Sequence, residues 1–151
     1  MTATFPLQPL LELSRNQLDD AARKLGQLIA SEEEASKRYH LLVTYREEYQ
    51  TRFMEAAKNG LSQREWSNYN HFLARIDDAI IQALLSVTTT QQRTLAGQQN
   101  WQGRQGRVKA FNTLSDRHHA QISAQEQRAE QKISDEHTAK RYNDKNSNAD
   151  K

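Results

Sequence analysis

Apolar side chains recur along the first third of this chain with a seven-residue period. If heptad position a is placed at Leu11, it falls again on Leu18, Leu25 and, further along, Phe53, and position d, three residues after each a, is mostly apolar as well. A spacing of alternately three and four residues gathers these side chains on one face of a helix. The pattern therefore predicts a long helix from about residue 9 to residue 58.

A strong break follows this helix at residues 59–62. Asn59 and Gly60 favour the left-handed conformation that commonly ends helices. Ser62 and Glu65 have the spacing of a capping box, in which each side chain accepts a hydrogen bond from the backbone N–H of the other residue. The sequence thus predicts a turn at residues 59–62, with Ser62 as the N-cap of a second helix.

The second apolar stripe keeps the same period. Its position a begins at Trp66 and its position d at Tyr69, and the frame holds without a skip. We expect this helix to run from about residue 63 to residue 137. Residues 138–151 are polar and aperiodic, which predicts a flexible tail.

The two stripes can pack against each other within one chain. Antiparallel helices oppose position a with position d, so we expect Phe53 to face Tyr69 and Leu25 to face Gly97. The predicted fold is all-α, a long two-stranded antiparallel coiled-coil hairpin forming a single domain over residues 1–137.

The second helix is longer than the first, so part of it should overhang. We expect no partner for residues after about Leu114. Positions a and d turn polar in that region, for example at Ser115 and His118.

Composition agrees with a thin seam between two helices rather than a thick core. Hydrophobic residues make up 36% of the chain, and the mean hydropathy is −0.97. The chain has no cysteine, a formal net charge of +2 with both signs interspersed, and no apolar run of the ~20 residues that a membrane span needs. The first residues lack the basic start and apolar core of a signal peptide.

Residues that carry chemistry are scattered. His118 and His119 are adjacent instead of three or four residues apart, and acidic neighbours such as Asp77 and Asp78 point about 100° apart on a helix. We therefore expect no catalytic residue, no metal site and no cofactor. Arg104, Arg107 and Lys109 form a short basic stretch, but aspartate and glutamate recur along the same helix and no basic groove with interleaved aromatic residues is present, which argues against nucleic-acid binding.

Two aromatic residues occupy heptad position g, which is charged in most coiled coils. These are Tyr45 and Phe72, and antiparallel pairing places them side by side. Apolar strips of this kind mark partner-binding surfaces. The alternative is that the two rings only thicken the seam.

Several segments resemble the FliJ family, the general chaperone-like component of the bacterial flagellar type III export apparatus. The similarity covers nearly the whole chain. It is carried by FPLQPLLELS at residues 5–14, LDDAARKLG at 18–26, YREEYQ at 45–50, Asn59-Gly60, W-x-x-Y-x-x-F at 66–72 and FNTLSDRH at 111–118.

The resemblance implies a non-enzymatic stalk similar to that of the F1 ATPase gamma subunit. Its end with both termini would dock in the hexameric ring of the export ATPase FliI, and its other half would contact the export gate protein FlhA. It would also recycle flagellar export chaperones. The protein would be cytoplasmic, peripheral at the cytoplasmic face of the inner membrane through the export apparatus, and a monomer when free.

The resemblance also implies which residues make these contacts. The export-gate contact maps onto Arg38, Leu42, Tyr45, Tyr49, Phe72, Ile76, Ala79 and Ala83. The ATPase-ring docking end maps onto Leu7, Leu10, Leu11, Leu18, Phe111 and Leu114.

Two other functions fit the same pattern. One is the equivalent stalk protein of a virulence type III secretion system, and the other is a purely structural or dimerising coiled coil. A hairpin whose seam is satisfied within one chain should be a monomer, whereas a dimerising coiled coil should not.

Overall fold

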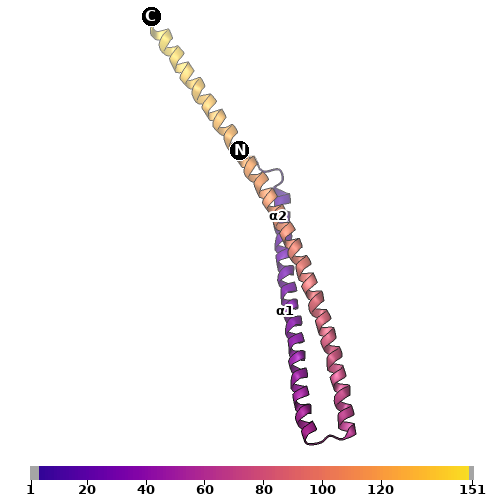
Figure 1. Ribbon diagram of the computed structural model, residues 1–151. Coiled ribbons are helices and arrows are strands. Elements are labelled where there is room, and N and C mark those ends of the chain that lie inside the picture. The colour runs from indigo at the N-terminus through magenta and orange to yellow at the C-terminus, as the bar shows by residue number, and fades with distance from the viewer. Residues whose placement is uncertain (1–3, 150–151) are drawn as a thin grey trace. The chain divides into compact units, whose positions relative to one another are not determined.

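The computed structural model describes residues 4–149, and its regular structure in that range consists of two α-helices. Helix α1 spans Gln8–Lys58 and helix α2 spans Gln63–Ala149 (Figure 1). No strand occurs within the described residues, which confirms the predicted all-α class. The sequence placed the end of the second helix near residue 137, whereas α2 continues to Ala149. This last stretch contains neither proline nor glycine, so no residue there interrupts the helical backbone.

The turn between the helices has the predicted local chemistry. Gly60 has a φ of 87°, a left-handed conformation that costs little only for glycine. The backbone N–H of Glu65 donates to Oγ of Ser62 over 3.2 Å, and the backbone N–H of Ser62 donates to Oε2 of Glu65 over 3.4 Å. This reciprocal pair is the capping box, and it fixes the first residue of α2.

The chain forms two compact units, and each combines a segment of α1 with a segment of α2. The first unit comprises residues 1–16 and 105–151, of which 4–16 and 105–149 are described, and the second comprises residues 17–104. The single hairpin domain over residues 1–137 stays a prediction.

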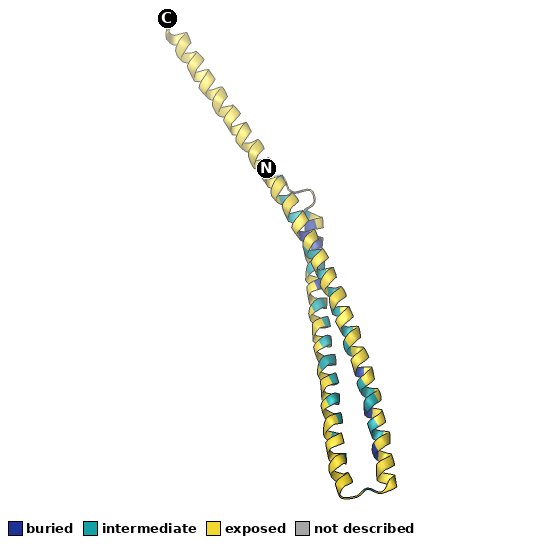
Figure 2. Ribbon diagram, in the orientation of Figure 1, coloured by how far each residue is buried: buried dark blue, intermediate teal, exposed yellow. Residues whose placement is uncertain are grey.

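The second unit is an antiparallel hairpin with a thin core. Its buried residues include Ala21 on α1 and Tyr69, Ile76 and Ala83 on α2, all at heptad position d. The half-buried residues lie on the facing sides of the two helices (Figure 2). The seam therefore follows the heptad frame, and most of its side chains keep contact with water along their edges.

The side chains of α1 pack directly over Gly97 of α2. A Cβ atom at this position would lie 2.6 Å from Cδ1 of Leu28 and 3.7 Å from Cδ1 of Leu25. The predicted opposition of Leu25 and Gly97 is confirmed, although Leu28 comes nearer. The hydroxyl of Thr94 donates across the seam to the backbone carbonyl of Leu28 over 3.3 Å.

The first unit extends its seam further than the sequence indicated. Leu11, Ser14 and Val108 are buried, and Phe5, which precedes α1, is buried against His118 with 5.6 Å between ring centroids. The expectation that α2 has no partner after about Leu114 is therefore wrong. The reason is that the chain before the helix folds back and provides one more apolar side chain.

Candidate functional site

An aromatic cluster joins α1 to α2 in the second unit. The ring of Tyr45 meets the ring of Phe72 nearly edge-on, with centroids 6.2 Å apart and planes at 80°. The ring of Tyr49 lies between two rings of α2, 4.5 Å from Phe72 and 5.1 Å from Tyr69. The predicted contact between the two aromatic residues at position g is confirmed.

The cluster continues toward the turn through stacked rings. Phe53 and Tyr69 lie nearly parallel, with centroids 3.5 Å apart and planes at 14°, and Trp66 packs 5.2 Å from Phe53. The predicted pairing of Phe53 with Tyr69 is therefore confirmed. Offset and edge-on aromatic pairs each add about 0.5–1.5 kcal/mol beyond their burial. These ring contacts link α1 to α2 at this end of the hairpin.

The members of the cluster differ in how much they expose. Tyr69 is 8% exposed and belongs to the core, whereas Tyr45 is 43% exposed. Tyr49 and Phe72 are half-buried. Tyr45 thus presents an apolar ring to solvent while the rings beneath it hold the helices together.

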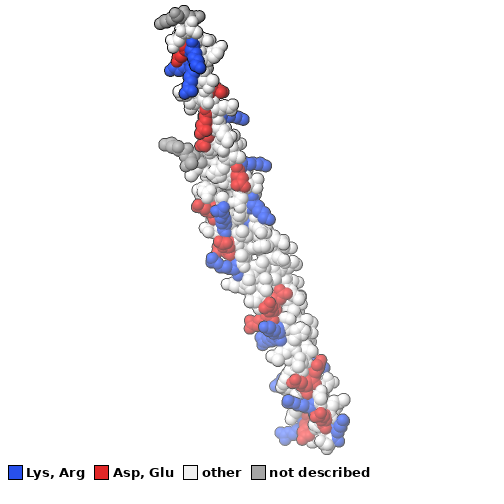
Figure 3. Space-filling model, turned by 90° about the vertical axis from the view of Figure 1, so that its left-hand side faces the viewer, with Lys and Arg blue, Asp and Glu red and all other residues white. Residues whose placement is uncertain are grey.

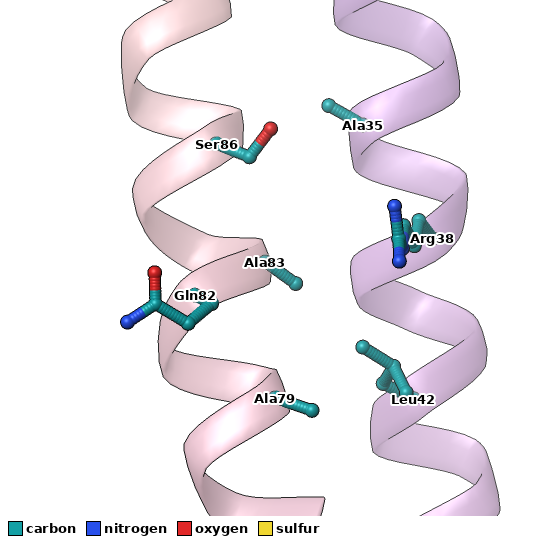
Figure 4. A pocket seen from close by; sticks show the side chains of 7 residues that line it. All are labelled: Ala35, Arg38, Leu42, Ala79, Gln82, Ala83 and Ser86. Carbon is teal, nitrogen blue, oxygen red and sulfur yellow. The ribbon is translucent and has the colours of Figure 1, made fainter.

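A pocket lies next to the cluster in the same unit, where small side chains leave space between the helices. Its volume is about 370 Å³. In Figure 4, Ala35 and Leu42 of α1 point toward Ala79 and Ala83 of α2 across this space. The pocket is lined by Ala35, Arg38, Leu42, Ala79, Gln82, Ala83 and Ser86.

The eight residues expected at the export-gate contact fall into two groups in the second unit. Seven of them line the pocket or contribute rings to the cluster, namely Arg38, Leu42, Ala79 and Ala83 for the pocket and Tyr45, Tyr49 and Phe72 for the cluster. The eighth, Ile76, is buried, and so is Ala83. Because Ile76 and Ala83 are buried, a partner would contact mainly the other six residues.

An ion pair at the edge of the seam was missed by sequence reasoning. Nε of Arg46 donates to Oδ1 of Asp77 over 2.5 Å, which links α1 to α2. The hydrogen bond to Asp77 raises the pKa of Arg46 above its ordinary value. In the heptad pattern Arg46 is a charged residue that interrupts the apolar stripe. The sequence signal that could have revealed the pair is Asp77, a carboxylate at an edge position of the other helix.

Three of the six residues expected at the ATPase-docking end are exposed. Leu7, Leu10 and Leu114 all belong to the first unit and are 37–47% exposed. The other three are partly or wholly in the seam: Leu11 and Phe111 in the first unit and Leu18 in the second. A partner that binds the first unit would meet the three exposed leucines.

The described residues contain neither a cluster of metal ligands nor a membrane-spanning helix. Between residues 4 and 149, no three side chains of His, Cys, Asp or Glu come together as metal ligands would. Neither helix in that range is apolar over a sufficient length to cross a bilayer.

The fold and the aromatic cluster define a class of two-helix antiparallel coiled-coil protein with an apolar strip at one edge of its seam. The model of the flagellar FliJ protein family matches residues 3–147. A flagellar FliJ protein of Salmonella typhi is 32% identical over 130 residues, covering 86% of this chain and 88% of that protein. The corresponding protein of Escherichia coli K12 is 27% identical over the same shares of both chains. The chain belongs to the FliJ family.

Proposed function

We propose that this protein is a non-enzymatic component of flagellar protein export that works as a stalk-like adapter. Its first unit docks in the ring of the export ATPase FliI. A surface that we call the aromatic strip contacts the export gate protein FlhA and consists of Arg38, Leu42, Tyr45, Tyr49, Phe72 and Ala79. It also escorts flagellar export chaperones. The observation that carries the proposal is the half-exposed ring of Tyr45, fixed against Phe72 beside a pocket in the seam.

The strip has the properties of a binding hot spot. Tyr45 offers a large apolar ring to a partner, and its contact with Phe72 holds that ring in place before binding, which lowers the entropy cost of association. The neighbouring pocket can receive a side chain of the partner. Aromatic anchors beside pockets often contribute most of the binding free energy of an interface.

The gate contact is tested with Tyr45→Ala and a matched control, Leu41→Ala. Leu41 is also on α1 but is 70% exposed and belongs to neither the cluster nor the pocket. Removal of an aromatic anchor should cost about 2–4 kcal/mol of binding. We expect Tyr45→Ala to weaken binding to FlhA more than about 30-fold, while circular dichroism shows unchanged helix content. Equal affinities of the two variants would refute the strip as the contact surface.

ATPase docking is tested with a charge placed on the exposed leucines of the first unit. Leu7→Asp combined with Leu10→Asp should abolish capture of FliI in a pull-down, because a partner that buries these side chains would then bury unpaired carboxylates. Leu41→Asp serves as the control and should leave capture intact. Capture that is unaffected by the double variant would count against docking through this end.

The proposed localisation follows from the same partners. We place the protein in the cytoplasm and, through the export apparatus, at the cytoplasmic face of the inner membrane. Membership of the flagellar FliJ family favours the flagellar system over the equivalent stalk of a virulence secretion system. A purely structural coiled coil would bind neither FliI nor FlhA.

A further inference from the structure

The two edges of the seam in the second unit differ in charge. Heptad position g of both helices forms one edge, which we call the g edge, and position e forms the other. Within residues 17–104 the g edge has one acidic residue, Glu65, whereas position e has no lysine or arginine and one acidic residue, Asp77. The g edge also has four basic residues, namely Lys24, Arg38, Arg52 and Arg93. Basic side chains therefore collect on one side of this hairpin.

The four cations of the g edge have no acidic partner among the described residues. All four are exposed, and none of them belongs to an ion pair in that part of the chain. The carboxylate of Glu65 accepts a hydrogen bond from the backbone N–H of Ser62 in the capping box, and it forms no ion pair with Arg52. An acidic partner would therefore have no carboxylate of this chain to displace.

Three pockets of the second unit lie along the g edge, and each has at least one of these cations in its lining. Their volumes are about 370, 340 and 320 Å³. Arg38 lines the first pocket, where Figure 4 shows its side chain beside the space between the helices, and Arg52 lines the third. Lys24 and Arg93 line the second pocket from opposite helices. Alanine with leucine or aromatic residues completes each lining, so a partner can place an apolar side chain in a pocket and a carboxylate beside it.

The spacing of the cations matches a helix better than a nucleic acid. Lys24, Arg38 and Arg52 lie two heptads apart along α1, which is about 21 Å. In Figure 3 the charged side chains form separate groups with uncharged surface between them. A strand of DNA carries a phosphate about every 3.4 Å, so most of its charges would meet no cation. The heptad positions of a coiled-coil helix recur at the same interval as these cations.

The backbone of the partner also favours a helix. Backbone N–H and C=O groups along this edge are bonded within α1 and α2, so the edge offers a partner mainly side chains. An extended peptide that covers the edge would need other partners for its own backbone groups. A helix satisfies those groups internally and can be buried at lower cost.

We propose that the g edge binds an acidic amphipathic helix of a partner protein, which packs beside α1 and α2 as a third strand of the coiled coil. Its apolar residues enter the pockets, and its Asp or Glu side chains lie beside the four cations. Tyr45 and Phe72 of the aromatic strip belong to this edge, so the inference rests on the proposed gate contact and states the chemistry of the segment that the strip receives. The pocket between Lys24 and Arg93 lies outside the strip, which allows separate tests.

The first test uses a synthetic peptide of about 30 residues with leucine at positions a and d and glutamate at e and g. Repulsion between its glutamates opposes its own association. In fluorescence anisotropy, the labelled peptide should bind the full chain at least about tenfold more tightly than the same peptide with lysine in place of glutamate. Equal affinities, or no binding of the glutamate peptide, would overturn the proposal.

The second test locates the contact by charge reversal. Lys24→Glu combined with Arg93→Glu should weaken binding of the glutamate peptide about tenfold, because both changes replace attraction by repulsion. The matched control is Lys37→Glu combined with Arg75→Glu, which changes the net charge equally at exposed positions outside the g edge. The control should weaken binding less than about threefold. Equal losses in the two double variants, with normal circular dichroism, would refute docking at this edge.

The gate contact and this inference fail in different measurements. If Tyr45→Ala weakens binding to FlhA but the chain does not prefer the glutamate peptide, the gate contact stands and this inference is wrong. If Tyr45→Ala leaves binding to FlhA unchanged while the glutamate peptide binds and Lys24→Glu with Arg93→Glu weakens it, the acidic-helix site stands and FlhA is not its ligand.

Discussion

The ring of Phe53 lies flat on the ring of Tyr69, with 3.5 Å between their centroids, and this contact joins the end of α1 to the start of α2. Phe53→Ala should lower the free energy of unfolding by about 2–4 kcal/mol, because it removes both a half-buried ring and its partner stacking. Met54→Ala, at the neighbouring position that is 61% exposed, should change it by less than about 0.5 kcal/mol. Thermal and urea unfolding followed by circular dichroism would measure the difference. Similar losses in both variants would contradict a structural role for the stack.

Stability should fall at alkaline pH because of Tyr69. Burial raises the pKa of this phenol above its ordinary value of 10.0, so the folded state holds the proton more tightly than the unfolded state. The contribution of Tyr69 to stability is therefore complete below pH 10 and is lost as the pH rises through the raised pKa. Melting temperatures measured from pH 9 upward should fall less steeply in Tyr69→Phe than in the unchanged protein. Identical slopes would show that the phenol is not responsible.

Two glycines should respond to alanine in opposite directions. A Cβ at Gly103 would meet nothing within 4 Å, so Gly103→Ala should stabilise α2 by about 1 kcal/mol through helix propensity. Gly60 has a φ of 87°, so Gly60→Ala should cost about 1–2 kcal/mol at the turn. Chemical denaturation of both variants would measure these values. A loss of stability in Gly103→Ala would mean that this face of α2 is less open than the structure shows.

The contact between Phe5 and His118 predicts opposite effects of two changes in the first unit. Among the described residues, Nε2 of His118 is buried without a hydrogen-bond partner, so His118→Leu should stabilise this unit by about 1 kcal/mol. Phe5→Ala should destabilise it, because Phe5 is buried. Amide hydrogen exchange over residues 105–122 would measure both. His119→Leu is the control, since His119 is exposed and should have little effect.

Much of the fold could be predicted because the heptad frame determines which side chains of each helix face the other helix. The heptad frame chosen from the sequence predicted burial at position d of α2, and Tyr69, Ile76 and Ala83 are indeed buried. A seven-residue period constrains which residues face the partner helix along its whole length. The adjacency of Tyr45 and Phe72 followed from the same frame.

The remaining features depend on interactions that a periodic pattern does not contain. Phe5 precedes α1 and has no heptad position, so its burial against His118 could not be predicted. The pairing of Arg46 with Asp77 depends on the direction that the long arginine side chain takes, and a heptad position specifies only where each Cβ lies. The end of α2 was also misplaced, because without a packing signal or a breaking residue the sequence carries no marker of where the helix ends.

Every residue of α2 from 123 to 149 is exposed, and this has a consequence for how the segment responds to heat. A stretch that buries nothing gains no free energy from tertiary contacts, and an isolated helix of this length is only marginally stable in water. Its helicity should therefore decrease gradually as the temperature rises, well before the paired region melts. A calorimetric scan would record that early change as a sloping baseline, whereas the paired helices would absorb their heat in a narrower peak.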